Sequence, residues 1–156
     1  MSSIGPELSS RPALILQENY PRVASELLRP LLNLFTSARE VCDGDVDKFL
    51  ILLAIAMRTT EHPDFKALSH EAILAGDPQV LPSLGTNIRS VAASVAIPKE
   101  TARRKLADLV EAGWLVRQGW DFRMTAKCYV GLEPVRLRLQ SMALSYHDLL
   151  GDLLGG

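Results

Sequence analysis

Residues 97–119 read IPKETARRKLADLVEAGWLVRQG, and this stretch decides which fold the chain can adopt. Pro98 suits the start of a helix, and Gly113 suits its end because glycine readily adopts a positive φ. Between them apolar side chains recur at helical spacing, which predicts a short helix with one buried face. The apolar positions are Ala102, Leu106, Leu109 and Val110, and the cations on the same helix are Lys99, Arg103, Arg104 and Lys105.

The flanking residues predict a helix before this one and a β-hairpin after it. Thr86 or Asn87 can cap the preceding helix, whose apolar residues fall on one face and which ends at the sequence AIP. A positive φ at Ala96, in the turn between the helices, would cost on the order of 1 kcal/mol. The sequence WLVRQGWDFRMT predicts two short strands, 114–117 and 122–125, around a turn at 118–121. The apolar face of the first helix consists of Ile88, Val91, Ala92 and Val95.

A helix, a tight turn, a second helix and a hairpin, in this order, are typical of a winged helix-turn-helix. Residues 86–125, about a quarter of the chain, resemble the DNA-binding domains of bacterial transcription regulators of the MarR, GntR and catabolite-activator types. The matching residues read VAASVAIPKETARRKLADLVEAGWLVR, with a small-residue helix, an Ile in the turn, a Pro before a polar start with Thr, and a Gly before an apolar strand. These families often have glycine in the turn, where this chain has Ala96. The resemblance implies binding of double-stranded DNA.

The charges are distributed unevenly along the chain, although the net charge is only −1. Residues 1–86 contain 7 Lys and Arg against 11 Asp and Glu, residues 87–138 contain 10 against 5, and residues 139–156 contain none against 2. The central block is therefore basic between two acidic blocks, which favours an anionic partner for this part of the chain.

Helical geometry places Arg103 and Arg104 on the face of the helix opposite the apolar residues. From that face either side chain could contact a guanine edge in the major groove. The first turn of a recognition helix typically enters that groove, and Thr101 there suits a phosphate oxygen. Arg89 lies on the outer face of the preceding helix, and the hairpin cations could reach the minor groove. The predicted DNA-contacting residues are Arg89, Lys99, Glu100, Thr101, Arg103, Arg104, Arg117 and Arg123. Alternatively, Arg104 simply pairs with Glu100 and Asp108, four residues to either side, on a solvated surface.

Outside this block, residues 1–20 are expected to form a loosely ordered arm, and residues 21–133 a helical domain that contains the winged helix-turn-helix. Pro21 can start a helix, which Pro30 would kink or divide. Asp45 is expected to cap a helix that runs to about Thr60, and a short helix is expected over residues 69–75.

Residues 134–156 are predicted to form a C-terminal association helix whose apolar residues are spaced 4-3-4-3-4. This seam could pair with its twin in a second chain or pack on the first helices of its own chain. We expect a homodimer, because two-fold pairing supplies a second DNA half-site and because the terminal helices form the dimer interface in the MarR-type proteins that the chain resembles. The seam consists of Val135, Leu139, Met142, Tyr146, Leu149 and Leu153.

The sequence contains no arrangement of residues that indicates an enzyme, a cofactor or a metal site. The three histidines are scattered, and Cys42 and Cys128 are expected to be buried and reduced. No secretory signal is recognisable, and the apolar run at 49–57 is too short to span a bilayer, so we expect a cytoplasmic protein.

The predicted fold is mainly α with a small β-hairpin wing, in which N-terminal and C-terminal helices flank the winged helix-turn-helix. The expected function is sequence-specific binding of double-stranded DNA as a transcription regulator. The alternative is a winged-helix module that binds another protein and never DNA. The sequence does not single out a small-molecule effector, although a pocket between the N-terminal helices and the central domain could hold one.

Overall fold

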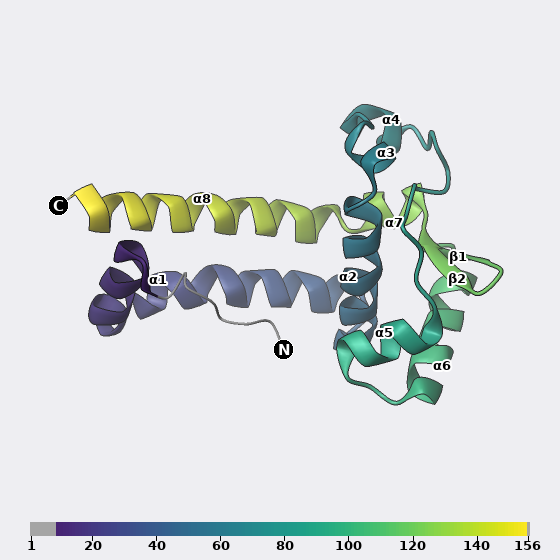
Figure 1. Ribbon diagram of the computed structural model, residues 1–156, viewed down its shortest axis with the longest axis horizontal. Coiled ribbons are helices and arrows are strands. Elements are labelled where there is room, and N and C mark those ends of the chain that lie inside the picture. The colour runs from purple at the N-terminus through teal and green to yellow at the C-terminus, as the bar shows by residue number, and fades with distance from the viewer. Residues whose placement is uncertain (1–8, 156) are drawn as a thin grey trace. The chain divides into compact units, whose positions relative to one another are not determined.

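The computed structural model describes residues 9–155, which are mainly helical and include a two-stranded antiparallel hairpin, as expected (Figure 1). The chain divides into two compact units, one of which combines the described residues up to Ser37 with those from Val135 onward, while the other is Ala38–Pro134. The elements are α1 (Arg11–Val41), α2 (Val46–Thr60), α3 (Pro63–Lys66), α4 (His70–Leu74), α5 (Ile88–Val95), α6 (Lys99–Glu111), β1 (Leu115–Gln118), β2 (Asp121–Met124), α7 (Ala126–Gly131) and α8 (Glu133–Gly155).

Helix α1 begins at Arg11, so the prediction of a loosely ordered arm is wrong for residues 11–20, while residues 1–8 lie outside the described part of the chain. The Ser10 hydroxyl accepts the backbone N–H of Ala13 at 3.4 Å and thereby caps the helix. Pro12 fits the first turn, where its missing N–H leaves no helical hydrogen bond unmade. The capping serine and the proline in the first turn start the helix here, although these residues show no sustained apolar periodicity.

Helix α1 passes through Pro21 and Pro30 without interruption, so a helix start at Pro21 and a division at Pro30 are both wrong. Figure 1 shows the first, deep purple turns of α1 at an angle to the rest of the helix. A proline inside a helix removes one i to i−4 hydrogen bond and clashes with the preceding turn, which bends the helix rather than ending it here.

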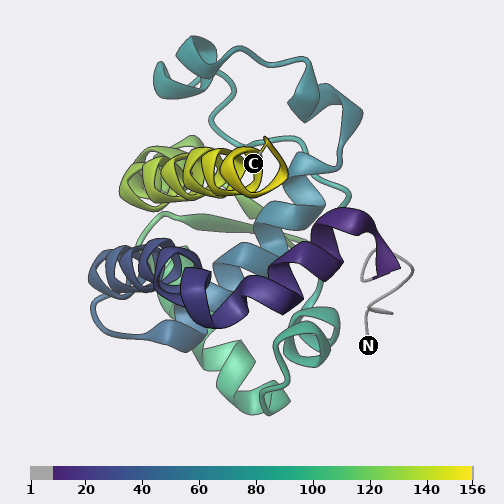
Figure 2. The same ribbon diagram turned by 90° about the vertical axis from the view of Figure 1, so that its left-hand side faces the viewer.

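In the first unit, α1 and α8 lie side by side and antiparallel (Figures 1 and 2). The hydroxyl of Tyr146 donates a hydrogen bond to the backbone oxygen of Leu27 on α1 at 2.7 Å. Leu149 and Leu153 face a groove of about 620 Å³ that Val23 of α1 also lines. This part of the predicted seam therefore packs within the chain, which is the intramolecular alternative.

The remaining seam residues differ in burial. On a straight helix, residues at heptad spacing rotate gradually around the axis, so they do not all face the same neighbour. Val135 is buried, Met142 is half-buried, and Leu139 is 51% exposed. The predicted domain boundary at residue 133 is close to the observed one, but residues 21–37 belong with α8 and not with the central unit.

The second unit is built around α2, α5, α6 and the hairpin, and its core residues come from all four. Asp45 caps α2 as predicted, since its side chain accepts the backbone N–H of Lys48 at 3.0 Å, and α2 ends at Thr60. Both cysteines are buried and free, and burial raises the pKa of Cys42 to about 11, so its thiol is unreactive at neutral pH. Side chains with almost no exposure are Ile51, Leu52, Ile55, Val91, Leu106 and Leu115.

Strand β2 lies between β1 and an extended segment over residues 79–86 that the sequence did not reveal. Leu81 N–H donates to the backbone oxygen of Met124 at 2.9 Å, and Phe122 N–H donates to that of Thr86 at 2.8 Å. The two strands lie within one residue of their predicted positions, and α4 matches the predicted short helix. The helices α3 and α7 were not predicted.

None of the helices in residues 9–155 combines the length and the apolar character that crossing a bilayer requires.

Candidate nucleic-acid interface

The turn between α5 and α6 contains Ala96 in the left-handed conformation, at the position where the families that the chain resembles often have glycine. Ala96 has φ 55° and ψ 45°, and its N–H bonds to the backbone oxygen of Ala92. Ile97 N–H bonds to the same oxygen at 3.1 Å, which closes the turn. Pro98 then directs the chain into α6, so two helices follow each other with only three residues between them.

The first turn of α6 has no side-chain cap, because Pro98 occupies the capping position. The first turn of α5, in contrast, is capped, since the side chain of Asn87 accepts the N–H of Ser90 at 3.0 Å. Uncapped N–H groups at a helix start carry partial positive charge and suit an anion. Lys99, Glu100 and Thr101 of the predicted site lie in this turn, so an anion there would meet a cation and a hydroxyl, and the Glu100 carboxylate beside them is paired with Arg103.

Three predicted cations come together from three separate elements. Arg89 of α5, Lys99 of α6 and Arg117 of β1 line one shallow depression of about 260 Å³. Asn87, Ile88 and Trp120 complete the lining, which contains no carboxylate. The surface of the depression is mostly apolar, so the three side chains line it mainly with their aliphatic stems, and each charged group can meet a separate anionic group of a ligand.

On the outer face of α6, Arg103 is paired and Arg104 is not, among the residues described. The Arg103 guanidinium hydrogen-bonds to the carboxylate of Glu100, and this hydrogen bond lowers the pKa of Glu100 below its ordinary value. The alternative pairs of Arg104 with Glu100 and Asp108 are not observed: Glu100 pairs with Arg103, and Oδ2 of Asp108 lies 3.5 Å from Nζ of Lys48. Arg104 therefore remains available to a ligand.

Lys105 is directed away from this face and ties α6 to the start of α2. Its Nζ lies 2.5 Å from Oδ2 of Asp45, and both side chains are more than two-thirds buried. Burial alone would raise the pKa of Asp45, but the hydrogen bonds from Lys105 and from Lys48 N–H, with the charges of both lysines, lower it below its ordinary value. Sequence reasoning missed this pair because 60 residues separate its members. Together with the Lys48–Asp108 pair, it fixes α6 against α2.

Arg123 does not join the depression. Alternation along β2 places Phe122 and Met124 toward the core and Arg123 on the opposite face. Arg117 is the cross-strand partner of Phe122 and therefore lies on the other side of the hairpin from Arg123. The Nε of Arg123 is buried without a hydrogen-bond partner in the described residues.

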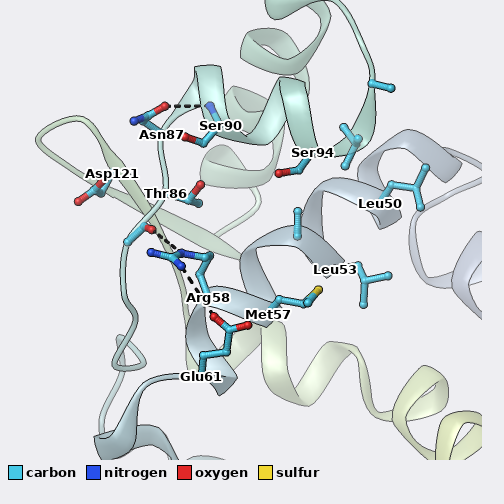
Figure 3. A pocket seen from close by; sticks show the side chains of 14 residues that line it. Leu50, Leu53, Met57, Arg58, Glu61, Thr86, Asn87, Ser90, Ser94 and Asp121 are labelled. Carbon is cyan, nitrogen blue, oxygen red and sulfur yellow. Dashed lines mark hydrogen bonds and ion pairs between the residues drawn. The ribbon is translucent and has the colours of Figure 1, made fainter. Parts of the chain in front are cut away.

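A larger cleft, of about 830 Å³, lies between α2 and α5 (Figure 3). Leu53 and Met57 of α2 form its apolar side and are 47% and 56% exposed. Ser90 and Ser94 of α5 contribute hydroxyl groups on the facing side. A cleft of this size with mostly apolar walls and a few polar groups has the character of a site for an organic molecule or an apolar protein segment.

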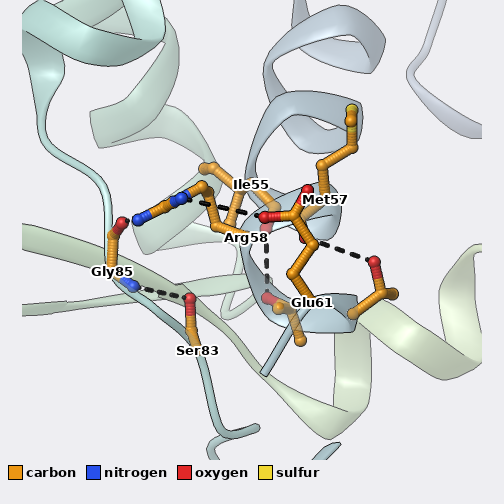
Figure 4. Close-up of polar contacts among 8 residues, drawn as sticks. Ile55, Met57, Arg58, Glu61, Ser83 and Gly85 are labelled. Carbon is orange, nitrogen blue, oxygen red and sulfur yellow. Dashed lines mark hydrogen bonds and ion pairs between the residues drawn. The ribbon is translucent and has the colours of Figure 1, made fainter. Parts of the chain in front are cut away.

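Arg58 closes one end of this cleft and is held by two partners (Figure 4). Its Nε donates to the backbone oxygen of Gly85 at 3.1 Å, and its Nη1 lies 3.8 Å from the carboxylate of Glu61. Gly85 N–H in turn donates to the hydroxyl of Ser83 at 3.0 Å. These contacts connect α2 to the extended segment that supports β2.

The histidines have local structural roles, and within residues 9–155 no group of three or more His, Cys, Asp or Glu is placed to hold a metal ion. His62 caps α3 by accepting the N–H of Asp64 at 3.0 Å, and His70 hydrogen-bonds to the Tyr129 hydroxyl at 2.8 Å. His147 is highly exposed, next to Asp148 on α8.

Comparison of the chain with protein-family models, with curated proteins and with solved structures found no match.

Proposed function

We propose that the protein binds double-stranded DNA sequence-specifically and acts as a transcription regulator rather than as an enzyme. In this proposal residues 86–125 form a winged helix-turn-helix in which α6 is the recognition helix and the β1–β2 hairpin is the wing. The observation that carries the proposal is the convergence of Arg89, Lys99 and Arg117 around a depression without a carboxylate. Cations that converge from separate elements match the spaced phosphates of a nucleic-acid backbone.

The two sets of cations have different roles in this proposal. The three cations of the depression hold phosphates and so position the protein on the duplex, whatever its sequence. Arg104, exposed on α6 and without an ion pair among the described residues, reaches a base edge and selects the site. Arg103 is held by Glu100, so it contributes less than its position on the helix suggests.

We further propose that the DNA-binding form is a homodimer joined through α1 and α8. Leu28, Leu32 and Leu144 are 53%, 66% and 67% exposed and lie outside the predicted seam. Two helices side by side leave much of their apolar surface in water, and a second copy would cover it. A two-fold dimer would also present two recognition helices to two half-sites.

The test is to bind the full chain to fragmented genomic DNA at two salt concentrations and to sequence the retained fragments. Wild type and the control Lys66→Gln, which changes an exposed lysine of α3, are expected to enrich one recurrent site. The variant Arg89→Gln/Lys99→Gln/Arg117→Gln is expected to lose retention of all fragments, and Arg104→Ala to lose only the preference. A lack of salt-sensitive retention by the wild type would refute DNA binding. Sedimentation of the free protein tests the dimer, and a monomer at every concentration would refute it.

A second candidate, a protein-interaction module, is favoured by the exposure of Leu53 and Met57 in the cleft between α2 and α5. An apolar interface of this kind loses little affinity as salt increases, whereas phosphate contacts lose affinity steeply. Leu53→Ser/Met57→Ser would abolish partner capture if the cleft is the functional surface, and would leave DNA retention unchanged if our first proposal is correct.

A further inference from the structure

Trp120, at the tip of the hairpin, is the most exposed of the large apolar side chains in the described residues, at 81%. Gln118 and Asp121 are cross-strand partners, so Gly119 and Trp120 form a two-residue turn. Gly119 has φ 63°, a conformation that favours glycine in the first position of such a turn. The second position imposes no comparable demand, and small polar residues are common there. The turn therefore explains the glycine but not the indole.

The indole is held in place from beneath by Arg117. The Arg117 guanidinium carbon lies 5.9 Å from the ring centre of Trp120 and 5.7 Å from that of Phe122. Its Nε donates to the backbone oxygen of Gly119 at 3.1 Å. Phe122 is only 3% exposed, so the Arg117 side chain that contacts the indole also packs on the buried core. A side chain held in this way loses little conformational entropy when it binds a ligand.

The other tryptophan has a different environment. Trp114 is half-buried, and a Cβ on Gly131 of α7 would lie 2.6 Å from its ring, so this indole packs directly on the backbone of that helix. Trp114 is thus part of the packing of the second unit. Trp120 does not share that packing, since four-fifths of its surface remains open.

The surroundings of Trp120 combine an aromatic face with positive charge. The indole borders the 260 Å³ depression that Arg89, Lys99 and Arg117 also line. A nucleotide carries a flat base that stacks on aromatic rings and a phosphate that pairs with Lys and Arg. A protein partner would need carboxylates to pair with the three cations and a separate apolar group to contact the indole.

We infer that Trp120 is a stacking wedge that contacts the bases of bound DNA at the minor groove, beside the groove that α6 occupies. This inference rests on the proposed function and adds a specificity-determining residue to it. Apolar side chains that enter the minor groove part neighbouring bases and kink the duplex. Pyrimidine–purine steps such as TA and CA/TG are the easiest to part, so Trp120 selects sites with such a step at the position of the hairpin tip.

The experiment uses the full chain with Trp114→Phe, which leaves Trp120 as the only indole, and short duplexes of random sequence and of the enriched site as probes. On binding DNA, the Trp120 emission is expected to be quenched and protected from acrylamide. In the otherwise unchanged protein, Trp120→Ala is expected to weaken binding about 5- to 150-fold at constant salt, the range that stacking contributes. Trp120→Phe should retain part of this affinity, and the salt dependence should not change.

A second measurement does not depend on the Trp114 variant. Permanganate oxidises unstacked thymines, so wild type should produce a reactive thymine within the bound site, and Trp120→Ala should not. DNA binding with Trp120 fully exposed, no reactive thymine and an unchanged affinity of Trp120→Ala would overturn the inference while the proposed function stands. Absence of DNA binding by the wild type would overturn both.

Discussion

The salt dependence of DNA binding gives the sharpest test of the cationic depression. Binding to duplex DNA releases counterions, and log K falls with log salt by about 0.9 for each phosphate neutralised. Arg89, Lys99 and Arg117 line one depression, so replacing all three by Gln should make the slope less negative by about 2.7 per bound chain. Between 50 and 200 mM salt, this difference corresponds to a change of about 40-fold in affinity.

The assay is fluorescence anisotropy of a labelled duplex, titrated with each variant at several salt concentrations. Single substitutions should each change the slope by about 0.9, and their effects should add, because each cation contacts its own phosphate. Lys66→Gln serves as the control for net charge, since this lysine is exposed on α3, outside the depression. If Lys66→Gln changed the slope as much as the cations of the depression do, the protein would respond to overall charge, and the local phosphate contacts would be refuted.

Arg104→Ala should weaken binding to the selected site by about 1–3 kcal/mol more than binding to random DNA, and equal losses on both would reject its role at a base edge. Asp45→Asn can keep the helix cap but loses the carboxylate that pairs with Lys105, so urea titration at pH 7 should give a free energy of unfolding about 1–2 kcal/mol lower. Because the pKa of Asp45 is lowered in the folded state, this stabilisation is present above the unfolded value of 3.8 and is lost as the pH falls through the folded value; a deficit that persisted at lower pH would contradict it. Gly131→Ala should destabilise the protein by at least about 1 kcal/mol more than the matched Gly151→Ala, because both glycines are helical but only the Cβ at 131 would lie 2.6 Å from the ring of Trp114; equal thermal shifts in calorimetry would exclude that clash.

Much of the central unit could be predicted because its elements are marked by local signals. Asn87 caps α5, Gly113 follows α6 with φ 77°, and Gly119 sets the hairpin turn, so each boundary is specified by residues next to it. Such signals depend on local capping hydrogen bonds or on backbone conformations that few residues adopt, so they do not require contacts with distant parts of the chain. The left-handed conformation of Ala96 has no such local signal, because alanine does not favour it.

The features that escaped prediction depend on partners far away in the sequence. Helix spacing indicated which cations of α6 avoid the core, but not that Lys105 would reach Asp45 or that Arg103 rather than Arg104 would take Glu100. The seam of α8 illustrates the same limit, because its spacing fits a partner helix from either chain. Only the three-dimensional arrangement shows that Tyr146 bonds to α1 of its own chain.

The position of β2 between β1 and residues 79–86 affects whether copies of the protein can associate edge to edge at high concentration. An unpaired strand edge can recruit a strand from another chain and begin aggregation. Here the outer edge of β2 is covered by the backbone hydrogen bonds to Leu81 and Thr86, so within the described residues the open edge of the hairpin is that of the four-residue β1. That edge ends in Arg117 and Gln118, whose exposed polar side chains discourage a further strand. Copies of this chain at high concentration would therefore keep their hairpins separate.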